Sequence, residues 1–291
     1  MGDYSRPLGL DEALRCMKSG AWRILAGGTD FYPAQGDRPI VENLLDLTAI
    51  AELRGITKLE NGWRFGGLTT WSDVVNAPLP AVFDGLKAAG REVGSIQIQN
   101  SGTLAGNICN ASPAADGIPP LLTLNTEVEL ASPGGRRRIA LSDFVTGVRS
   151  TERRSDELVS ALYIPDCGAG SRSAFHKLGG RRYLVISIAM AAVVIVPDDQ
   201  GKIIETRIAV GSCSPVAKRL TGLEQKLVGE AAASGLSARV TSEDFSVLSP
   251  IGDIRGSAAY RLSAAEELVK RALEQAVEAD GTMATGADEP V

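Results

Sequence analysis

The fold is decided by one stretch of small and polar residues, Ser101-Gly102-Thr103-Leu104-Ala105-Gly106-Asn107-Ile108-Cys109-Asn110-Ala111-Ser112-Pro113-Ala114-Ala115-Asp116. This stretch has too little apolar bulk to fill a core, so it predicts a long irregular loop. Loops of this length are uncommon in compact domains and are usually functional. Its Gly102–Asn107 part can offer backbone N–H groups, a hydroxyl and an amide to a polar ligand. A plain surface loop with turn glycines remains the alternative.

The first of two glycine-rich segments lies nearer the start of the chain, Ile24-Leu25-Ala26-Gly27-Gly28-Thr29-Asp30-Phe31, and Gly102–Asn107 is the second. An apolar strand that runs into Gly-Gly-Thr lets several N–H groups point outward, and such a concavity binds phosphate oxygens without a lysine. The segment is neither the G-x-G-x-x-G pattern nor a Walker loop. Alone, it is more often only a turn. Paired with Gly102–Asn107, it could hold a diphosphate from both sides, with Asp116 free to bind a ribose or ribityl hydroxyl.

Composition narrows the class of protein. The 291 residues are enough for one large domain or two ordinary ones. A net charge of −5 gives no support for a nucleic-acid or anionic-membrane partner. No apolar run approaches the roughly 20 residues that cross a bilayer. The polar start, residues 1–6, lacks the apolar core of a signal peptide. We therefore expect a cytoplasmic protein without a membrane span.

The chain has few of the usual catalytic side chains. Its four cysteines, Cys16, Cys109, Cys167 and Cys213, show no C-x-x-C spacing, so free thiols are expected rather than zinc or iron–sulfur ligands. The only histidine is His176, which argues against histidine metal sites and Ser–His–Asp catalysis. No catalytic or metal-binding residue is predicted. A bound cofactor is the favoured source of chemistry.

Hydrophobic periodicity and turn residues predict the main elements. We expect helices over 10–19, 70–76, 80–93 and 257–279, and strands over 22–26, 43–47, 63–68, 158–164 and 203–210. The apolar run 186–196 is predicted as a buried helix or strand. A glycine-rich link, Gly168-Ala169-Gly170, places a domain boundary near residue 170.

At the two glycine-rich segments the chain resembles the FAD-binding (medium) subunit of the xanthine dehydrogenase and carbon monoxide dehydrogenase family of molybdenum hydroxylases. Residues 26–30 look like the family's first flavin loop, and residues 102–107 with 111–116 look like its second. The resemblance continues through Ser173-Ala174-Phe175-His176-Lys177-Leu178 and covers nearly the whole chain. One departure is Ala105, where the family commonly has glycine. Its methyl group is tolerable at negative φ and would crowd a diphosphate at positive φ.

The resemblance implies an α+β fold: a vanillyl-alcohol-oxidase (PCMH)-type FAD-binding domain of two α/β subdomains, followed by a C-terminal α+β domain that covers the flavin. The implied FAD-binding domain is 1–170, with its subdomains split near 50–60. The implied C-terminal domain is 171–280, and 281–291 is predicted to be a disordered tail.

The resemblance also implies the cofactor site. Carried over by position, the FAD-binding residues are Ile24, Leu25, Ala26, Gly27, Gly28, Thr29, Asp30, Phe31, Gly102, Thr103, Leu104, Ala105, Gly106, Asn107, Asp116, Val159 and Lys177. Asp116 would bind a cofactor hydroxyl, Val159 would offer a backbone contact, and Lys177 would lie near the isoalloxazine ring. A surface lysine is the alternative for Lys177. An open flavin edge is expected near Gly66-Gly67 and Lys177.

The implied function is electron transfer within a larger enzyme. A molybdopterin-binding large subunit would oxidise the substrate, a small subunit would carry [2Fe–2S] clusters, and this chain's FAD would pass electrons to a terminal acceptor. A dimer of heterotrimers is expected. Two alternatives remain open: a free-standing FAD-dependent oxidase or reductase of the same fold, and a scaffold subunit without flavin.

Overall fold

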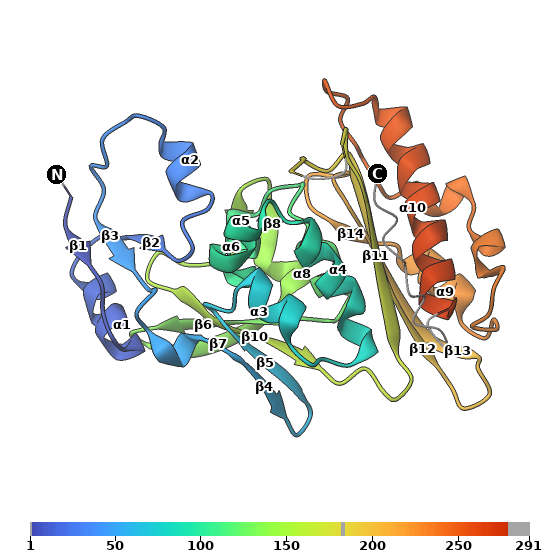
Figure 1. Cartoon of the computed structure of the whole chain (residues 1–291), viewed down its shortest axis with the longest axis horizontal. Coiled ribbons are helices and arrows are strands. Elements are labelled where there is room, and N and C mark those ends of the chain that lie inside the picture. The colour runs from blue at the N-terminus through green and yellow to red at the C-terminus, as the bar shows by residue number, and fades with distance from the viewer. Residues whose placement is uncertain (1, 182–183, 279–291) are drawn as a thin grey trace, which may run out of the picture.

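The computed structural model describes residues 2–181 and 184–278 (Figure 1). Three sheets follow one another along the chain, and a small hairpin accompanies the second. The predicted tail, 281–291, and the last two residues of the predicted C-terminal domain lie outside the described residues.

The first lobe is built on a parallel sheet of three strands, in the order β1-β3-β2. Its elements are β1 (Tyr4–Ser5), α1 (Leu10–Lys18), β2 (Arg23–Leu25), α2 (Phe31–Gln35), β3 (Leu44–Asp46) and the 3-10 helix η1 (Ala51–Leu53). Helix α1 buries Leu10, Ala13 and Met17, which lie on one face at helical spacing. Helix α2 stands away from the rest of this lobe (Figure 1). Strand β2 is one edge of this sheet, and the first glycine-rich segment begins in it.

The second lobe is built on an antiparallel sheet of five strands, in the order β4-β5-β10-β6-β7. Its strands are β4 (Ile56–Leu59), β5 (Gly62–Gly66), β6 (Glu127–Ser132), β7 (Gly135–Ala140) and β10 (Leu158–Pro165), with the hairpin β8 (Val145–Gly147) and β9 (Ser150–Thr151). Its helices are α3 (Trp71–Asn76), η2 (Ala81–Phe83), α4 (Asp84–Glu92), α5 (Ile96–Ser101), α6 (Leu104–Asn110), α7 (Ile118–Thr123) and α8 (Leu141–Phe144). Helix and sheet side chains share one core, which includes Phe65, Trp71 and Ile108.

The third lobe is an antiparallel sheet of four strands covered on one face by a long helix (Figure 1). Its elements are β11 (Arg172–Leu178), β12 (Ala189–Pro197), β13 (Ile203–Gly211), β14 (Lys218–Arg219), α9 (Thr221–Leu227), η3 (Leu236–Arg239), η4 (Ser242–Phe245) and α10 (Ala258–Glu278). Along β12, Ala191, Val193 and Ile195 pack in the core with α10. Val194 and Val196 pack in the core of the second lobe. This strand is apolar throughout because both of its faces are buried.

The apolar run 186–196, predicted as a helix or a strand, is therefore strand β12 from Ala189 onward. The predicted helix over 70–76 is confirmed: Thr70 and Asp73 form a capping box, in which Thr70 Oγ1 accepts from the Asp73 N–H at 3.1 Å. The predicted long helix near the C-terminus is confirmed as α10.

The prediction of an irregular loop over 101–116 is wrong. Helix α6 lies in the middle of it, capped at its start by Thr103. Leu104 and Ile108, one turn apart, are both buried in the core of the second lobe. The helix stops at Ala111, whose φ of 46° is in the left-handed region. The small residues Ala105 and Ala111 are buried in the same core.

Candidate functional site

The two glycine-rich segments meet at Gly27. A Cβ atom built on Gly27 would lie 1.9 Å from the carbonyl oxygen of Ser101 and 3.0 Å from Cα of Gly102. A Cβ on Gly102 would in turn lie 3.3 Å from Thr29 Oγ1. Glycine is required at these positions because backbone approaches backbone. The structure thus brings together two segments that are far apart in the sequence, as the sequence predicted.

The first segment presents a row of backbone donors. Within the described part of the chain, the N–H groups of residues 27–31 donate to no protein acceptor. Gly28 has a φ of 70°, which turns the chain between β2 and α2. Residues 27–29 are half-buried. Neighbouring N–H groups that have no internal partner form a concavity suited to phosphate oxygens.

The second segment is the start of α6. Thr103 Oγ1 accepts a hydrogen bond of 2.9 Å from the Gly106 N–H, and a Cβ on Gly106 would lie 2.8 Å from that oxygen. Ala105 lies inside the helix, outside the positive-φ residues, and is 5% exposed. Its methyl group therefore packs in the core, and the crowding considered for a positive φ does not arise.

Strand β2 leads into the first segment and attaches it to the first lobe. Leu25 is buried, and its carbonyl accepts from the N–H of Leu47 at 2.9 Å. Ile24 is half-buried and packs against the first-lobe core, as does Ala26. Phe31 opens α2, and the guanidinium carbon of Arg23 lies 5.6 Å from the centre of its ring. Asp30, at the N-cap of α2, is exposed.

Helix α6 is joined to Asp116 through Asn107. The Asn107 Oδ1 accepts from the N–H of Gly117 at 3.2 Å. A Cβ on Gly117 would lie 2.7 Å from the indole of Trp71, so this turn also packs closely on α3. Trp71 N–H donates to the carbonyl of Gly102 at 3.1 Å. Trp71, absent from the predicted site, therefore contacts the chain at both Gly102 and Gly117.

Asp116 and Lys177, both predicted site residues, are paired with each other. Lys177 Nζ donates to Asp116 Oδ2 at 2.7 Å, and Ser187 Oγ donates to Asp116 Oδ1 at 2.7 Å. Lys177 also reaches the carbonyl of Glu92 at 3.4 Å. Its side chain is 4% exposed, so the alternative of a surface lysine is wrong. Burial raises the pKa of the Asp116 carboxyl, and the hydrogen bonds from Lys177 and Ser187 oppose that rise.

This pairing uses part of the hydrogen-bonding capacity of Asp116. Each of its oxygens already accepts from the protein, so it is not a free acceptor, although each oxygen retains a lone pair. Ser187, which completes the network, was missed because a serine after an apolar residue carries no signal. The network joins the second lobe to the third, since Asp116 precedes α7 and Lys177 lies on β11.

Val159 and Gly66-Gly67 form a closed part of the structure. A Cβ on Gly67 would lie 2.3 Å from the Val159 carbonyl oxygen, and one on Gly66 would lie 2.2 Å from that of Leu53. All of these residues are buried. Gly66-Gly67 is therefore closed by the chain itself, and the open flavin edge expected near it and Lys177 stays a prediction. Strand β10, which carries Val159, contacts α6.

The site fits a dinucleotide with a diphosphate. Gly27 and Gly102 let the two segments pack backbone against backbone, beside the N–H groups of residues 27–31 that have no protein acceptor. Residues 2–181 and 184–278 contain no group of three or more histidine, cysteine or acidic side chains placed to hold a metal ion. No helix within the same ranges is long and apolar enough to span a bilayer.

Comparison with known proteins supports the same conclusion. Two protein-family models match: "FAD binding domain in molybdopterin dehydrogenase" over residues 1–167, and "CO dehydrogenase flavoprotein C-terminal domain" over residues 173–276. The medium subunit of nicotine 6-hydroxylase from Paenarthrobacter nicotinovorans is 30% identical over 277 residues, which is 94% of this chain and 96% of that protein. The carbon monoxide dehydrogenase medium chain of Hydrogenophaga pseudoflava is 27% identical, over 94% of this chain and 96% of its own length.

A solved structure agrees with these sequence matches. In the reconstituted CO dehydrogenase from Oligotropha carboxidovorans, one chain superposes with a TM-score of 0.88 and 27% identity, over 96% of this chain and 98% of that one. The predicted fold class is thereby confirmed. With both parts of the sequence matched and the relatives aligned over nearly their full length, this chain belongs to the family of FAD-binding subunits of molybdenum-dependent dehydrogenases and hydroxylases.

Proposed function

We propose that the cradle formed by residues 24–31 and 102–107 holds the diphosphate of FAD. One observation carries this proposal: Gly27 lies against Ser101 and Gly102, beside a row of N–H groups without protein acceptors. A diphosphate needs several donors and little steric bulk, and this cradle supplies both without a lysine. Thr29 and Thr103 add hydroxyl groups, although Thr103 Oγ1 already caps α6.

The second part of the proposal assigns Lys177 to the flavin ring and Asp116 to a cofactor hydroxyl. Lys177 has three ammonium donors, of which two have protein partners. Asp116 fixes the position of the ammonium group and balances its charge within a buried region. Bound FAD supplies the redox chemistry, and a nearby cation stabilises the negative charge of the reduced ring. Val159 is proposed as a backbone contact from β10.

The chain's place in a larger enzyme is the third part. We assign it a molybdopterin-binding large subunit and a [2Fe–2S] small subunit as partners, in a dimer of heterotrimers. The relatives named as medium subunits or medium chains support a multi-subunit assembly. In this assignment the FAD receives electrons from the partner's clusters and passes them to a terminal acceptor. The cytoplasm is the proposed compartment, in keeping with four cysteines that are free in the structure.

Replacing Gly27 with alanine tests the cradle. Gly27→Ala places a methyl group where the Ser101 carbonyl lies, so the two segments must separate and the N–H groups lose their alignment. Losing even one charge-assisted hydrogen bond to the diphosphate weakens binding about 10-fold or more. The measurement is the flavin-to-protein absorbance ratio of purified protein, followed by titration with FAD.

Gly20→Ala is the matched control, because a Cβ at Gly20 meets no atom within 4 Å. The proposal expects this variant to bind FAD like the original chain. If Gly27→Ala retains full FAD affinity, the cradle is misplaced. Co-expression with candidate large and small subunits, followed by native mass measurement, tests the stoichiometry separately.

A further inference from the structure

Arg207 of β13 is a buried cation with an unused hydrogen-bonding edge. Its exposed fraction is 3%, and its Nη1 donates to Glu205 Oε1 at 3.2 Å. Its Nε and Nη2 have no partner within the described chain. These two nitrogens form one side of the planar guanidinium, which presents a ready-made fork to an acceptor with two oxygens. A guanidinium cannot lose its proton in a protein, so the unpaired N–H groups on this edge require a hydrogen-bond acceptor.

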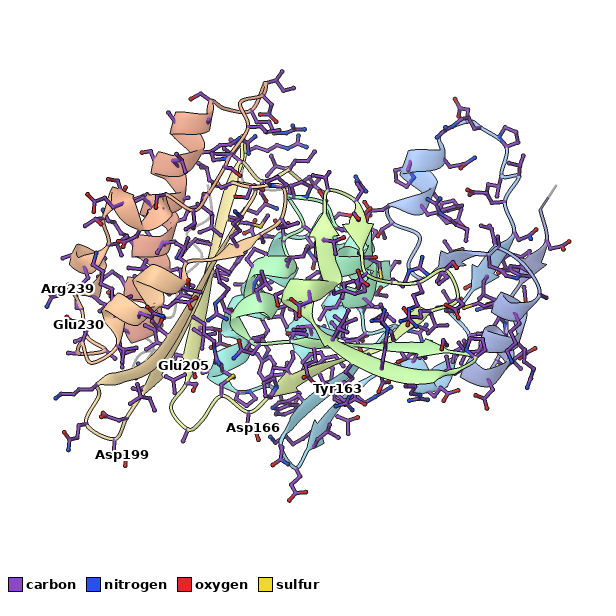
Figure 2. All side chains as sticks on the ribbon, turned by 180° about the vertical axis from the view of Figure 1, so that it is seen from behind. Tyr163, Asp166, Asp199, Glu205, Glu230 and Arg239 are labelled. Atoms are coloured by element: carbon purple, nitrogen blue, oxygen red, sulfur yellow. The ribbon has the colours of Figure 1, made fainter. Side chains whose placement is uncertain are left out.

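The register of β12 and β13 places the Arg207 side chain on the sheet face that the link between the second and third lobes crosses. Arg207 pairs with Val194 across β12 and β13, so both side chains lie on the same face of the sheet. Val194 and Val196 on that face pack in the second-lobe core. A Cβ on Gly168 would lie 3.6 Å from Val196 Cγ1, so the link passes over this face. Asp166 and Glu205 lie where the two sheets adjoin (Figure 2).

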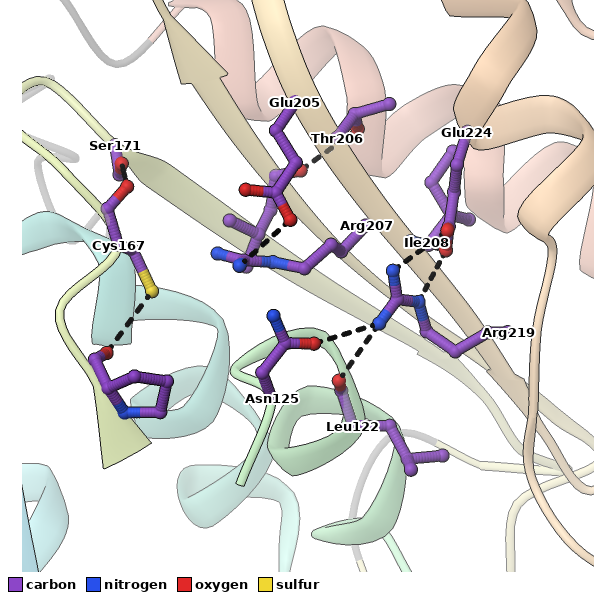
Figure 3. Close-up of polar contacts among 12 residues, drawn as sticks. Leu122, Asn125, Cys167, Ser171, Glu205, Thr206, Arg207, Ile208, Arg219 and Glu224 are labelled. Carbon is purple, nitrogen blue, oxygen red and sulfur yellow. Dashed lines mark hydrogen bonds and ion pairs between the residues drawn. The ribbon is translucent and has the colours of Figure 1, made fainter. Parts of the chain in front are cut away.

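Arg207 faces Cys167, the residue directly before the link. Figure 3 shows the guanidinium of Arg207 pointing toward the Cys167 sulfur. The thiol is half-buried and its nearest acceptor is the Pro165 carbonyl, at 3.6 Å. The link is held in place by Ser171, whose hydroxyl donates to the Cys167 carbonyl at 2.6 Å.

The thiol is reachable from outside. Cys167 lines a cavity of about 320 Å³, together with Trp63, Val82, Phe83 and Pro165. Burial raises the pKa of the Cys167 thiol, and the charge of Arg207 opposes that rise. A low thiol pKa is therefore not what would single this cysteine out. Cys167 is distinguished by the Nε–Nη2 edge of Arg207, which would stabilise an anionic product.

We propose that Cys167 is a site of oxidation by hydrogen peroxide, and that the Nε–Nη2 edge of Arg207 binds the sulfinate that forms. The thiolate sulfur attacks one peroxide oxygen; an S–O bond forms, the O–O bond breaks, and the departing hydroxide becomes water. The sulfur loses two electrons and the peroxide is reduced. A second peroxide takes the sulfenate to the sulfinate in the same way. The thiol proton goes to solvent, and two waters form in all.

The product has the shape that the fork accepts. A sulfinate carries one negative charge shared by two oxygens, as a carboxylate does, and a guanidinium binds such a group with two parallel N–H···O bonds. The bridge would join the link after β10 to strand β13 of the third lobe. Oxidation would thus tie the FAD-binding lobes to the C-terminal sheet. This inference is independent of the proposed flavin contacts.

Mass spectrometry after peroxide treatment tests the proposal. The full chain is treated with hydrogen peroxide and sulfinate is followed at Cys167, with the distant Cys16 as the internal reference. In Arg207→Gln, sulfinate formation at Cys167 is expected to slow about 10-fold or more, with no change at Cys16. Glu205→Gln, which leaves the fork intact, should keep the fast rate. Equal rates at Cys167 with and without Arg207 would overturn the proposal.

A second measurement avoids peroxide and does not depend on the Arg207 variant. Cys167→Asp places a carboxylate before the fork, and Cys167→Asn places a neutral group of the same shape there. The proposal expects the Asp variant to unfold at a temperature several degrees higher than the Asn variant. In an Arg207→Gln background that difference should vanish. If the Asp and Asn variants unfold at the same temperature, the fork is already satisfied by water and the proposal fails.

Discussion

Lys177 and Asp116, 61 residues apart in the sequence, form a buried ion pair whose nitrogen and oxygen atoms are 2.7 Å apart. Lys177 belongs to the third lobe and Asp116 to the second, so the contact joins the two. Both side chains are nearly inaccessible to water. The placement of the C-terminal sheet and the polarity of the proposed flavin site therefore depend on the same pair of residues.

Neutralising Asp116 should destabilise the protein strongly. Asp116→Asn leaves the Lys177 ammonium buried without a counter-charge, and removing one partner of a buried pair costs about 3 kcal/mol. Urea unfolding measures the change. Glu267→Gln is the control, because it breaks the exposed pair with Arg271 in α10 and should cost about 0.5 kcal/mol or less. Equal costs for the two variants would show that the Asp116 pair is not energetically special.

Stability in acid should depend on Asp253. The backbone N–H of Arg255, and then the Arg261 side chain, hold the pKa of Asp253 at about 2, below its ordinary 3.8. A carboxyl with a lowered pKa stabilises the fold above its unfolded value, and this contribution is lost as the pH falls from 3.8 toward 2. Asp253→Asn should flatten the pH dependence of the free energy of unfolding in that window.

The control for Asp253 is Asp199→Asn. Asp199 lies at the outer turn between β12 and β13 (Figure 2), whereas the partners of Asp253 are Arg255 and Arg261. This variant should keep the acid slope of the original chain. An unchanged slope in Asp253→Asn would contradict the assignment.

Removing the cap of α6 should affect both stability and cofactor binding. Thr103→Ala removes the oxygen that accepts from Gly106, which costs about 1 kcal/mol. It also loosens the first turn of the helix, where the cradle lies, so FAD affinity should fall. Thr103→Ser keeps the oxygen and should retain most of both. Calorimetry and FAD titration measure the two effects, and a serine variant as weak as the alanine variant would argue against the capping role.

Replacing Ala105 tests whether its methyl group affects FAD binding. Ala105→Gly restores the residue that the family commonly has, but Ala105 is in a helix and its methyl group is buried. The substitution should cost about 1 kcal/mol through the helix propensity of glycine and leave FAD affinity unchanged. A gain in FAD affinity on titration would show that the methyl group crowds the cofactor.

The sequence predicted elements whose signals are local. Helix α3 has its cap at Thr70 and its apolar residues in the next turn, and α10 has a long amphipathic pattern. Helix α6 was missed because glycine, asparagine and alanine outweighed the signal that was present. That signal was Thr103 as a cap, followed by Leu104 and Ile108 at helical spacing.

The remaining features of the site depend on contacts between residues far apart in the sequence, which local sequence patterns do not predict. The pairing of the two glycine-rich segments was expected, but the close contact of Gly27 with Ser101 follows from how β2 and α5 end. The pairing of Asp116 with Lys177 was not predicted at all, because a single sequence does not show which distant charges meet. Burial of Gly66-Gly67 was missed for the same reason: the carbonyls that close it come from η1 and β10.

Hydrogen exchange on the original chain tests the central claim most directly. Amide exchange is compared between flavin-free and FAD-loaded protein, with peptides covering residues 24–31 and 102–107. The amides of residues 27–31 have no protein acceptor, whereas most amides of residues 102–107 already donate within the chain. The account therefore predicts rapid exchange at 27–31 without FAD, and slower exchange of both segments with it. If FAD slows exchange elsewhere and leaves both segments unchanged, the cofactor does not lie in the cradle.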